Sequence, residues 1–371
     1  MSEWTFGVEE EFILVDADTG RLAAQAAAVR HGADASGSDD ELQLELTRYQ
    51  VEIASPVCTT ADQLSENLTR LRGRLAASAR ERNLHLLATG TAVLAEPWPP
   101  PLAGQDRYQV IAERFGGLID TLCGCHVHVA IPDAEFGIKL SNHLRPWLPL
   151  LLALSANSPF SRGQDSGHAS WRHVTWARWP SAGPPPFFES AAHYEASVSA
   201  LLHVGAALDR KMIYWDIRLS EAQPTLEFRV CDVAATVEEA VLLGVLVRAL
   251  AQAASHDLDT GVPAKPVPHE VLRAALWRAA RDGLGGYCPD PESGALLPVS
   301  VVLRRARQRL RPFLLDNGEL ELVEELTEHL CTVGGGAHRQ RQAMARRGEP
   351  MDVVDLLARQ TTVSSLLDSP S

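Results

Sequence analysis

Carboxylate and imidazole side chains recur in this sequence as pairs two positions apart. Glu9 and Glu11 stand in one apolar run, and His126 and His128 stand in another. Because side chains on a β-strand alternate between its two faces, residues two apart point to the same side. We therefore predict that each pair shares one face of a strand and that Glu10 lies on the opposite, apolar face. Taken singly, the first pair also fits a solvated edge strand, and the second fits histidines satisfied within a core.

The segment 41–55 carries the next side chains of this kind. Its leucines occupy even-numbered positions, and the apolar residues from Tyr49 onward occupy odd-numbered positions. A two-residue alternation cannot change parity without a bulge or a turn, which we place at 47–48. Beyond that break, Gln50 and Glu52 are predicted to face away from the apolar side.

A last polar strand, at 224–233, places a carboxylate beside a guanidinium group. Glu227 and Arg229 share one of its faces, and Arg218 follows Asp216 by two positions just upstream. Each of these strands, considered alone, also fits a sheet with one face in water. Their agreement on one pattern favours a shared polar site.

Such a cluster is rich in oxygen and free of thiols, which suits Mg²⁺ or Mn²⁺ better than zinc. The candidate metal ligands are Glu9, Glu11, Glu52, His126 and Glu227. Carboxylates that hold Mg²⁺ beside arginines are typical of a triphosphate site, so Arg218 and Arg229 are the candidate catalytic residues. Candidate contacts for ATP and substrate are Gln50, His128, Arg178 and Arg229. The common nucleotide folds are unsupported, since the chain has neither GxxxxGK[ST] nor GxGxxG before a helix.

Interleaved strand and helix signals predict an α+β fold. Strands are expected at 5–15, 41–55, 84–89, 123–132, 212–219 and 225–233. Capping boxes at Thr60 and Thr236 begin two helices, and further helices are expected at 141–156, 192–208, 270–283, 300–310 and 319–332. After a linker at 257–268 the chain turns mainly helical. We treat 1–371 as a single catalytic domain, with an α+β core (1–255) and a helical part (256–371).

Composition narrows the classes of partner. The net charge of −13 argues against a nucleic-acid partner, since binding nucleic acid requires a basic surface. The longest apolar stretch, 147–156, contains Pro149 and is shorter than the ~20 residues needed to cross a bilayer. The chain begins without a basic-then-apolar secretion pattern, so we expect a cytoplasmic protein with no membrane partner. Its six cysteines match no zinc spacing and are expected as free thiols.

Two segments outside the strands leave alternatives open. The segment 158–186 is long and rich in Gly, Pro, Trp and Arg, and we interpret it as a substrate lid in which Arg162, Arg172 and Arg178 could hold a carboxylate. A structural surface loop fits the same composition. The glycine-rich segment 334–341 either wraps an anion or is a helix stop followed by a basic helix start.

The ordered set of these motifs resembles the bacterial carboxylate–amine ligases of the glutamate–cysteine ligase type 2 group. The resemblance runs from about residue 5 to about residue 355 and rests on FGVEEEFILVD, YQVEIASPVCT, CGCHVHV, LPLLLALSANSPFSRGQD, WDIRLSEAQPTLEFRVCDV and GGGAHRQR. Three positions depart from the usual pattern: Leu219 replaces a proline, Ser166 a threonine and Ala275 an asparagine. These differences leave the predicted metal ligands intact and bear on the choice of substrate.

The resemblance implies a glutamine-synthetase-like catalytic fold, in which a curved, mostly antiparallel sheet forms an open funnel and helices pack outside it. It implies ATP and Mg²⁺ (or Mn²⁺) in the funnel, with Arg229 on the transferring phosphate. The metal ions would be held by Glu9, Glu11, Glu52, Glu227 and His126. It also implies a homodimer and amino-acid substrates, glutamate and cysteine by default, although the sequence does not identify the pair.

The implied reaction converts a carboxylate into an acyl phosphate, which an amine then attacks to form an amide. Two other interpretations remain open. A phosphotransferase of the guanidino-kinase type would stop at the phosphorylated product, and a nucleotide-binding protein would do no chemistry. Amine-dependent ADP release distinguishes the ligase from the kinase, and any ATP turnover excludes the binding protein.

Overall fold

Seven strands form the central sheet of the computed structural model, which describes residues 4–34, 41–95, 97–104 and 106–362. The strands lie in the order β2–β3–β1–β5–β9–β8, and β4 pairs with the end of β1. Each pairing described in this sheet is antiparallel. The bounds are β1 (Phe6–Asp16), β2 (Leu42–Leu44), β3 (Gln50–Ala54), β4 (Leu84–Leu87), β5 (Gly124–Ala130), β8 (Ile217–Leu219) and β9 (Thr225–Asp232). This open sheet with helices outside it confirms the predicted fold class.

The register of the sheet brings the predicted polar side chains into one row. Glu9 lies opposite His126 across β1 and β5, and Glu11 lies opposite Glu52 across β1 and β3. Glu227 on β9 continues the row beyond β5. The predicted change of parity is confirmed as a turn between β2 and β3.

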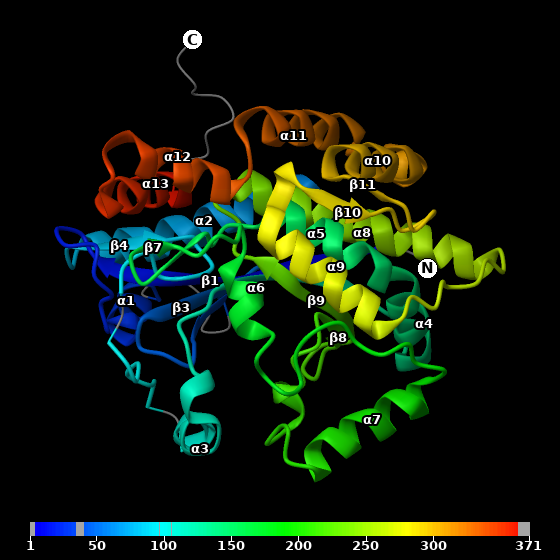
Figure 1. The fold of residues 1–371 in the computed structure, drawn as a ribbon, viewed down its shortest axis with the longest axis horizontal. Helices are drawn as coiled ribbons and strands as arrows, with labels where there is room; N and C mark the ends of the chain where they lie inside the picture. Colours follow the sequence, from blue (N-terminus) through cyan, green and yellow to red (C-terminus); the bar gives the residue numbers. More distant parts are fainter. Residues whose placement is uncertain (1–3, 35–40, 96, 105, 363–371) are drawn as a thin grey trace.

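Helices cover the other face of the sheet, in two layers (Figure 1). The first layer is α2 (Ala61–Arg80), α4 (Ala134–Leu144), α5 (Leu148–Ser155) and α8 (Val237–Asp259). The outer elements are α9 (His269–Asp282), α10 (Val299–Asp316), α11 (Leu320–Val333), α12 (Gly336–Arg347) and α13 (Pro350–Thr362). Both predicted capping threonines are confirmed, since Thr60 accepts from the N–H of Gln63 and Thr236 from that of Glu239.

Close packing fixes this helical layer on the sheet. A Cβ on Gly244 of α8 would lie 2.9 Å from Leu64 of α2, so no larger residue fits at this crossing without a shift. Glu10 points into the same layer, as predicted, and its carboxylate accepts hydrogen bonds from Arg72 at 2.6 and 2.9 Å. Both side chains are at most 1% exposed, so the first layer contains a buried ion pair.

The face that carries Glu9 and Glu11 is enclosed by a smaller set of elements, drawn below the sheet in Figure 1. These are α3 (Asp106–Phe115), α6 (Trp171–Trp176) and α7 (Ala191–His203). Their apolar side chains form a second core, separate from the main one and rich in aromatic rings. This second core supports one wall of the cavity described below.

Several sequence-based elements differ from the structure. The helix expected at 141–156 is interrupted by a 3-10 turn at Arg145–Trp147, where the residue Pro146 breaks the regular pattern. The strand expected at 212–219 is reduced to β8, and the expected linker at 257–268 begins inside α8. At 334–341 the structure shows a helix stop, with Gly334 at φ 83°, followed directly by α12.

The helices α3, α6 and α13 were not predicted from the sequence. Neither were the remaining elements, which are α1 (Ala26–Ala33), β6 (Phe160–Ser161), β7 (Gln164–Asp165), β10 (Tyr287–Pro289) and β11 (Leu296–Pro298). Across the described residues, no helix has the length and apolarity required to cross a membrane.

Candidate active site

A cavity of about 350 Å³ lies on the face of the sheet opposite α2 and α8. Strands β1, β3, β5 and β9 supply its polar floor, and the elements below the sheet supply its wall. The floor side chains are Glu9, Glu11, Gln50, Glu52, His126 and Arg229, joined by Glu45 and Arg218. Four of the five predicted metal ligands therefore line one cavity directly, and Glu227 contacts them from β9.

Glu9, His126 and Glu227 form a first triad. One ligand atom from each lies within 4.8 Å of the others. Glu9 Oε2 is 3.3 Å from Nδ1 of His126, and its Oε1 is 3.3 Å from Nε2 of His128. Nε2 of His126 is buried and has no hydrogen-bond partner among the described residues, so it can bind a ligand.

The protonation states of this triad suit a cation. Burial alone would raise the pKa of Glu9, but hydrogen bonds with His126 and His128 outweigh it, and the pKa lies well below the usual value. Burial, assisted by the charge of Arg229, lowers the pKa of His126 to about 4. At neutral pH the triad therefore offers ionised Glu9 and a neutral imidazole, which is the form that binds metals.

Glu11, Glu45 and Glu52 form a second triad, again with one oxygen from each within 4.8 Å of the others. Glu11 Oε2 accepts a hydrogen bond from the N–H of Gly124 at 2.6 Å. Burial and the nearby charge of Glu45 raise the pKa of Glu11 to about 8, and the same two causes raise the pKa of Glu52. Within the described part of the chain, no lysine or arginine forms an ion pair with these three carboxylates, so protons or a bound cation must relieve their repulsion.

Two arginines hold Glu227 from either side. Arg218 donates through Nε at 2.8 Å and Nη2 at 3.2 Å, and Arg229 donates to the carboxylate through Nη1. Burial would raise the pKa of Glu227, but the charges of Arg229 and Arg218 outweigh it and keep the carboxyl ionised. Nε of Arg229 is buried and lacks a partner among the described residues, which leaves one donor for a bound anion.

An aromatic wall faces this charged floor. Tyr214 packs against Trp176 and Trp179, with ring centroids 4.6 and 5.4 Å apart. Tyr108 from α3 also lines the cavity, and Arg107 beside it is held by Asp209 at 2.7 and 3.0 Å. The cavity thus has a charged side that suits phosphates and metal ions and an aromatic side opposite it.

A model of glutamate–cysteine ligase family 2 matches residues 5–358. The chain belongs to this family. A protein of Mycolicibacterium smegmatis, named "Putative glutamate--cysteine ligase 2-3", is 49% identical over 366 residues, covering 96% of this chain and 98% of the relative. A protein of Rhodococcus jostii, named "Putative glutamate--cysteine ligase 2-1", is 46% identical over 358 residues, covering 95% of each chain. The predicted family and the predicted ligase class are confirmed.

Solved structures agree on the fold of this family 2 ligase. Glutamate–cysteine ligase of Francisella tularensis, solved in complex with AMP, matches with a TM-score of 0.71 over 98% of this chain and 90% of its own, at 11% identity. The bifunctional glutathione synthetase of Pasteurella multocida matches with a TM-score of 0.70 over 97% of this chain and 52% of its own, at 16% identity. At such low identity these matches bear on the fold alone.

Three of the predicted substrate contacts either lie outside the charged floor or form hydrogen bonds with other residues of the chain. Arg178 donates to the carbonyl of Gly117 at 2.8 Å and does not line the cavity. Gln50 lines it, but its amide donates to Leu122 O at 2.8 Å and accepts from Thr47, so it holds the local backbone. His128 contacts Glu9 and hydrogen-bonds Thr225 at 2.9 Å, which makes it a support for Glu9.

Sequence reasoning missed several side chains of this site. Glu45 lies in the connection between β2 and β3 and was not predicted as a ligand. The aromatic wall was also missed, because its members come from separate segments without a shared period. Trp176 belongs to the predicted lid segment 158–186, and that segment is tied down at one end. Ser158 and Ser170 both donate to the buried carboxylate of Asp232, at 2.6 and 2.7 Å.

Proposed function

We propose that this family 2 ligase uses ATP and Mg²⁺ to convert a carboxylate into an acyl phosphate and then joins it to an amine. The observation that carries the proposal is the convergence of two carboxylate triads and two arginines in one cavity. Chemistry of this kind brings several anions together, so it depends on a site with fixed positive groups and divalent ions.

The donor set fits Mg²⁺ or Mn²⁺. Five carboxylates and one neutral imidazole are the ligands, with no thiol among them. When ionised, the five carboxylates carry more charge than the two guanidinium groups of Arg218 and Arg229 can offset. The unpartnered Nε2 of His126 offers one further ligand atom. When held by these carboxylates and His126, divalent ions would supply positive charge that offsets the charge developing on the transferring phosphate.

The remaining roles belong to the chain's own residues. We assign Arg229 to the transferring phosphate, because its Nε is an unused buried donor. Arg218 acts as a positioning residue, since four of its five N–H donors are taken by Glu227 and by the carbonyls of Lys211 and Ile213. Loss of one preorganised contact to the developing charge typically costs about 3–4 kcal/mol of transition-state stabilisation.

In the proposed sequence, an oxygen of the substrate carboxylate attacks the γ-phosphorus of ATP and ADP leaves. The amine nitrogen then attacks the acyl carbon, phosphate leaves, and the amine gives up a proton. Water would hydrolyse the acyl phosphate, so the wall formed by Trp176, Trp179 and Tyr214 protects the intermediate. Both steps need one continuous cavity, which is why we treat 1–371 as one catalytic domain.

Glutamate and cysteine are the substrates that we propose for this site, on the strength of the family and of its relatives' names. Small amino acids match a cavity of about 350 Å³ with charged and aromatic sides. A cytoplasmic location would supply both amino acids and ATP. The proposed lid role of 158–186 fits the presence of Trp176 in the cavity wall.

The test is an assay of ADP release with Mg²⁺ and ATP over a panel of carboxylates and amines, with the product identified by mass spectrometry. A ligase releases ADP in proportion to amide, and only when both partners are present. ADP release that needs one partner alone, with a phosphorylated product, would instead establish the phosphotransferase. No turnover with any pair would overturn the enzymatic proposal.

A matched pair of variants connects that activity to the site. Glu52→Gln removes one oxygen ligand of the second triad and should reduce turnover by about 100-fold or more. Glu66→Gln, on the exposed side of α2, makes the same chemical change away from the cavity and should leave turnover unchanged. Near-normal turnover of Glu52→Gln would remove that residue from the metal site.

A further inference from the structure

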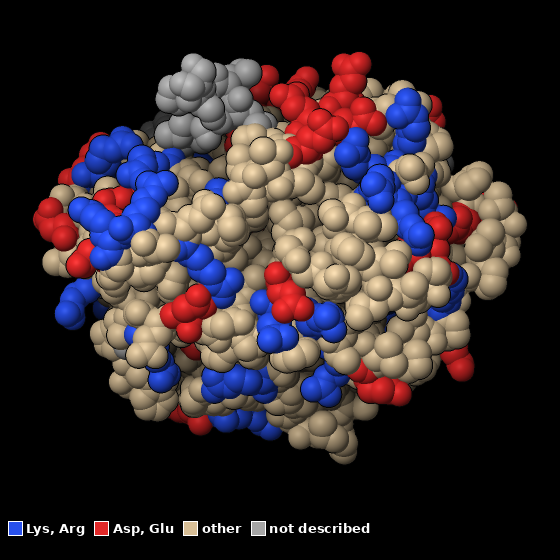
Figure 2. Space-filling view, turned by 45° about the horizontal axis from the view of Figure 1, so that its top comes forward, with Lys and Arg blue, Asp and Glu red and all other residues tan. Residues whose placement is uncertain are grey.

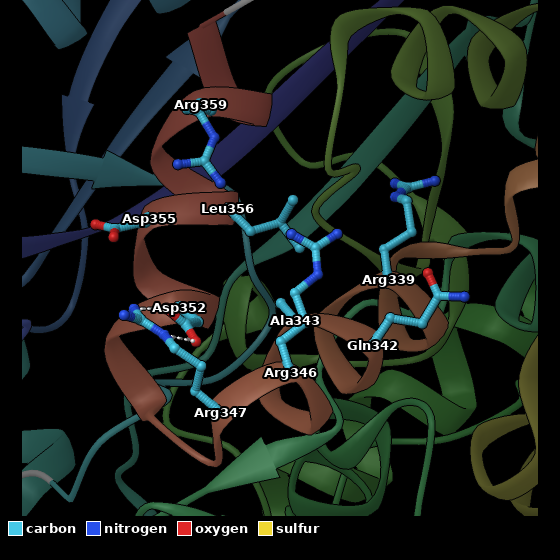
Figure 3. A pocket seen from close by; sticks show the side chains of 9 residues that line it. All are labelled: Arg339, Gln342, Ala343, Arg346, Arg347, Asp352, Asp355, Leu356 and Arg359. Carbon is cyan, nitrogen blue, oxygen red and sulfur yellow. Dashed lines mark hydrogen bonds and ion pairs between the residues drawn. The ribbon is translucent and has the colours of Figure 1, made fainter.

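We propose that helices α12 and α13 form a second ligand site, which binds a small phosphate-bearing molecule. The site is a cavity of about 330 Å³ between the two helices. Its basic lining comes from Arg339, Arg346, Arg347 and Arg359 (Figure 3). A cavity of this size matches small-molecule sites.

Two of these arginines lack partners that would neutralise them. Arg346 and Arg359 are exposed and form no ion pair or hydrogen bond within the described residues. Figure 3 shows the guanidinium group of Arg346 reaching over Leu356 toward Arg359. Side chains of like charge do not gather around one hollow without an energetic cost, so their arrangement favours an anion between them.

The acidic residues of the cavity do not cancel this charge. Asp352 accepts from Arg347 through both of its oxygens, once at 2.9 Å. The hydrogen bond from Arg347 is the main cause that lowers the pKa of Asp352, and the charges of Arg346 and Arg359 add to it. Asp352 is thereby committed to Arg347. Asp355 is the second carboxylate of the lining, so the four arginines still exceed the acidic residues by two.

Arg339 supplies a fixed third wall. Its side chain is only 11% exposed, it pairs with Glu239 at 2.5 Å, and its Nη1 donates to the carbonyl of Gly334 at 2.8 Å. Its Nε is buried and has no hydrogen-bond partner among the described residues. Arg339 thus adds a nearly buried guanidinium group with an unused donor to the edge of the basic cavity.

The frame around these arginines is rigid. On the next residue of α12, Gln340 is buried and donates to Asn157 O at 3.0 Å and to Asn157 Oδ1 at 2.8 Å. Gly348 then ends α12 in the left-handed region at φ 75°, which allows the tight turn into α13. A preorganised site of this kind loses little entropy when it binds a ligand.

The small extent of the basic surface also indicates that the ligand is compact. Basic side chains, which are arginines in these two helices, gather over the α12–α13 corner in Figure 2, whereas the net charge of the whole chain is −13. A long polyanion such as nucleic acid would extend beyond this corner over a protein of negative net charge, which disfavours its binding. Planar guanidinium groups pair with phosphate in a bidentate manner, so a compact phosphate or pyrophosphate group fits best.

This site is separate from the candidate active site. Figure 1 places α12 and α13 in the outer helical layer, on the side of the sheet away from the carboxylate triads. No residue lines both cavities. The inference therefore does not rest on the proposed ligase activity.

The experiment is isothermal titration of the full chain with inorganic pyrophosphate at low ionic strength and without divalent ions. Comparison variants are Arg346→Gln/Arg359→Gln and a control, Arg273→Gln/Arg304→Gln, which removes two exposed arginines of α9 and α10. We expect the first variant to lose about tenfold or more in affinity and the control to bind as the wild type does. Both variants should keep the melting temperature and the basal turnover of the wild type.

The result that overturns the inference is equal pyrophosphate binding by the wild type and by Arg346→Gln/Arg359→Gln. An equal loss in the control variant also overturns it, because the attraction would then reflect net charge and not a built site. A titration with Arg339→Gln provides a third check. This variant should weaken binding although Arg346 and Arg359 are intact.

Discussion

Glu10 and Glu11 are neighbours on β1, yet the structure predicts opposite consequences for the same substitution. Glu10 is fully buried and forms a two-pronged ion pair with Arg72, which also donates to Ala234 O at 2.9 Å. Glu10→Gln leaves the buried guanidinium group without a counter-charge. Breaking a buried pair by removing one partner costs about 3–5 kcal/mol, a large part of the 5–15 kcal/mol that stabilises a typical domain.

Glu11→Gln should have no such cost. The pKa of Glu11 is raised to about 8 by burial and by Glu45, so its ionised form is disfavoured in the metal-free fold. A neutral amide removes that repulsion, and the free energy of unfolding should stay the same or increase. The same substitution should abolish turnover, since it removes a ligand from the second triad.

The assay is urea unfolding of both variants in the presence of EDTA, followed by tryptophan fluorescence. The reasoning requires a loss of about 3–5 kcal/mol for Glu10→Gln and no loss for Glu11→Gln. Equal stability losses in the two variants would refute the reasoning that the helical face of β1 stabilises the fold and that its cavity face serves the reaction. So would a Glu10→Gln variant within about 1 kcal/mol of the wild type.

Three further predictions concern the site. Glu9→Gln should weaken Mn²⁺ binding, measured by titration, by about tenfold or more, whereas Glu66→Gln should not change it. Arg178→Gln should keep KM and kcat within about twofold of wild type, because its guanidinium group contacts Gly117 and not the cavity; a larger effect would restore it as a substrate contact. Asp232→Asn weakens the hydrogen bonds that anchor Ser158 and Ser170, so limited proteolysis should cut 158–186 faster, and an unchanged rate would show that the anchor is unimportant.

The charged floor could be predicted from the sequence because strand periodicity is a local property. Side chains two apart share a face whatever the sheet does around them, so Glu9 and Glu11, or Glu227 and Arg229, were grouped correctly from spacing alone. Their convergence depends on strand order and register. Strand order and register are properties of the whole sheet, and before the structure only the family resemblance indicated them.

The site residues that were missed lie outside regular strands, where periodicity does not predict the direction of a side chain. Glu45 sits between two strands, where backbone geometry and not periodicity sets the direction of a side chain. Arg178 follows the short helix α6, so its direction depends on how that helix docks. The helices α12 and α13 were not predicted because the glycines at 334–336 are flexible and fit an anion-binding loop and a helix start equally well.

The fold places glutamate in two different environments on the two faces of β1, and the groups nearby decide the outcome. On the helical face, α2 brings Arg72 against Glu10, and the charge is cancelled inside the core. On the cavity face, no lysine or arginine of the described chain forms an ion pair with Glu11 or Glu52. The pKa values of both rise because burial penalises their charge, and for Glu11 the charges of Arg172 and Arg229 offset this only in part. A fold could relieve that repulsion with a lysine, but a resident ammonium group would occupy the place of a divalent ion. The unrelieved repulsion in the second triad is therefore the physical reason to regard it as a metal site rather than as a structural cluster.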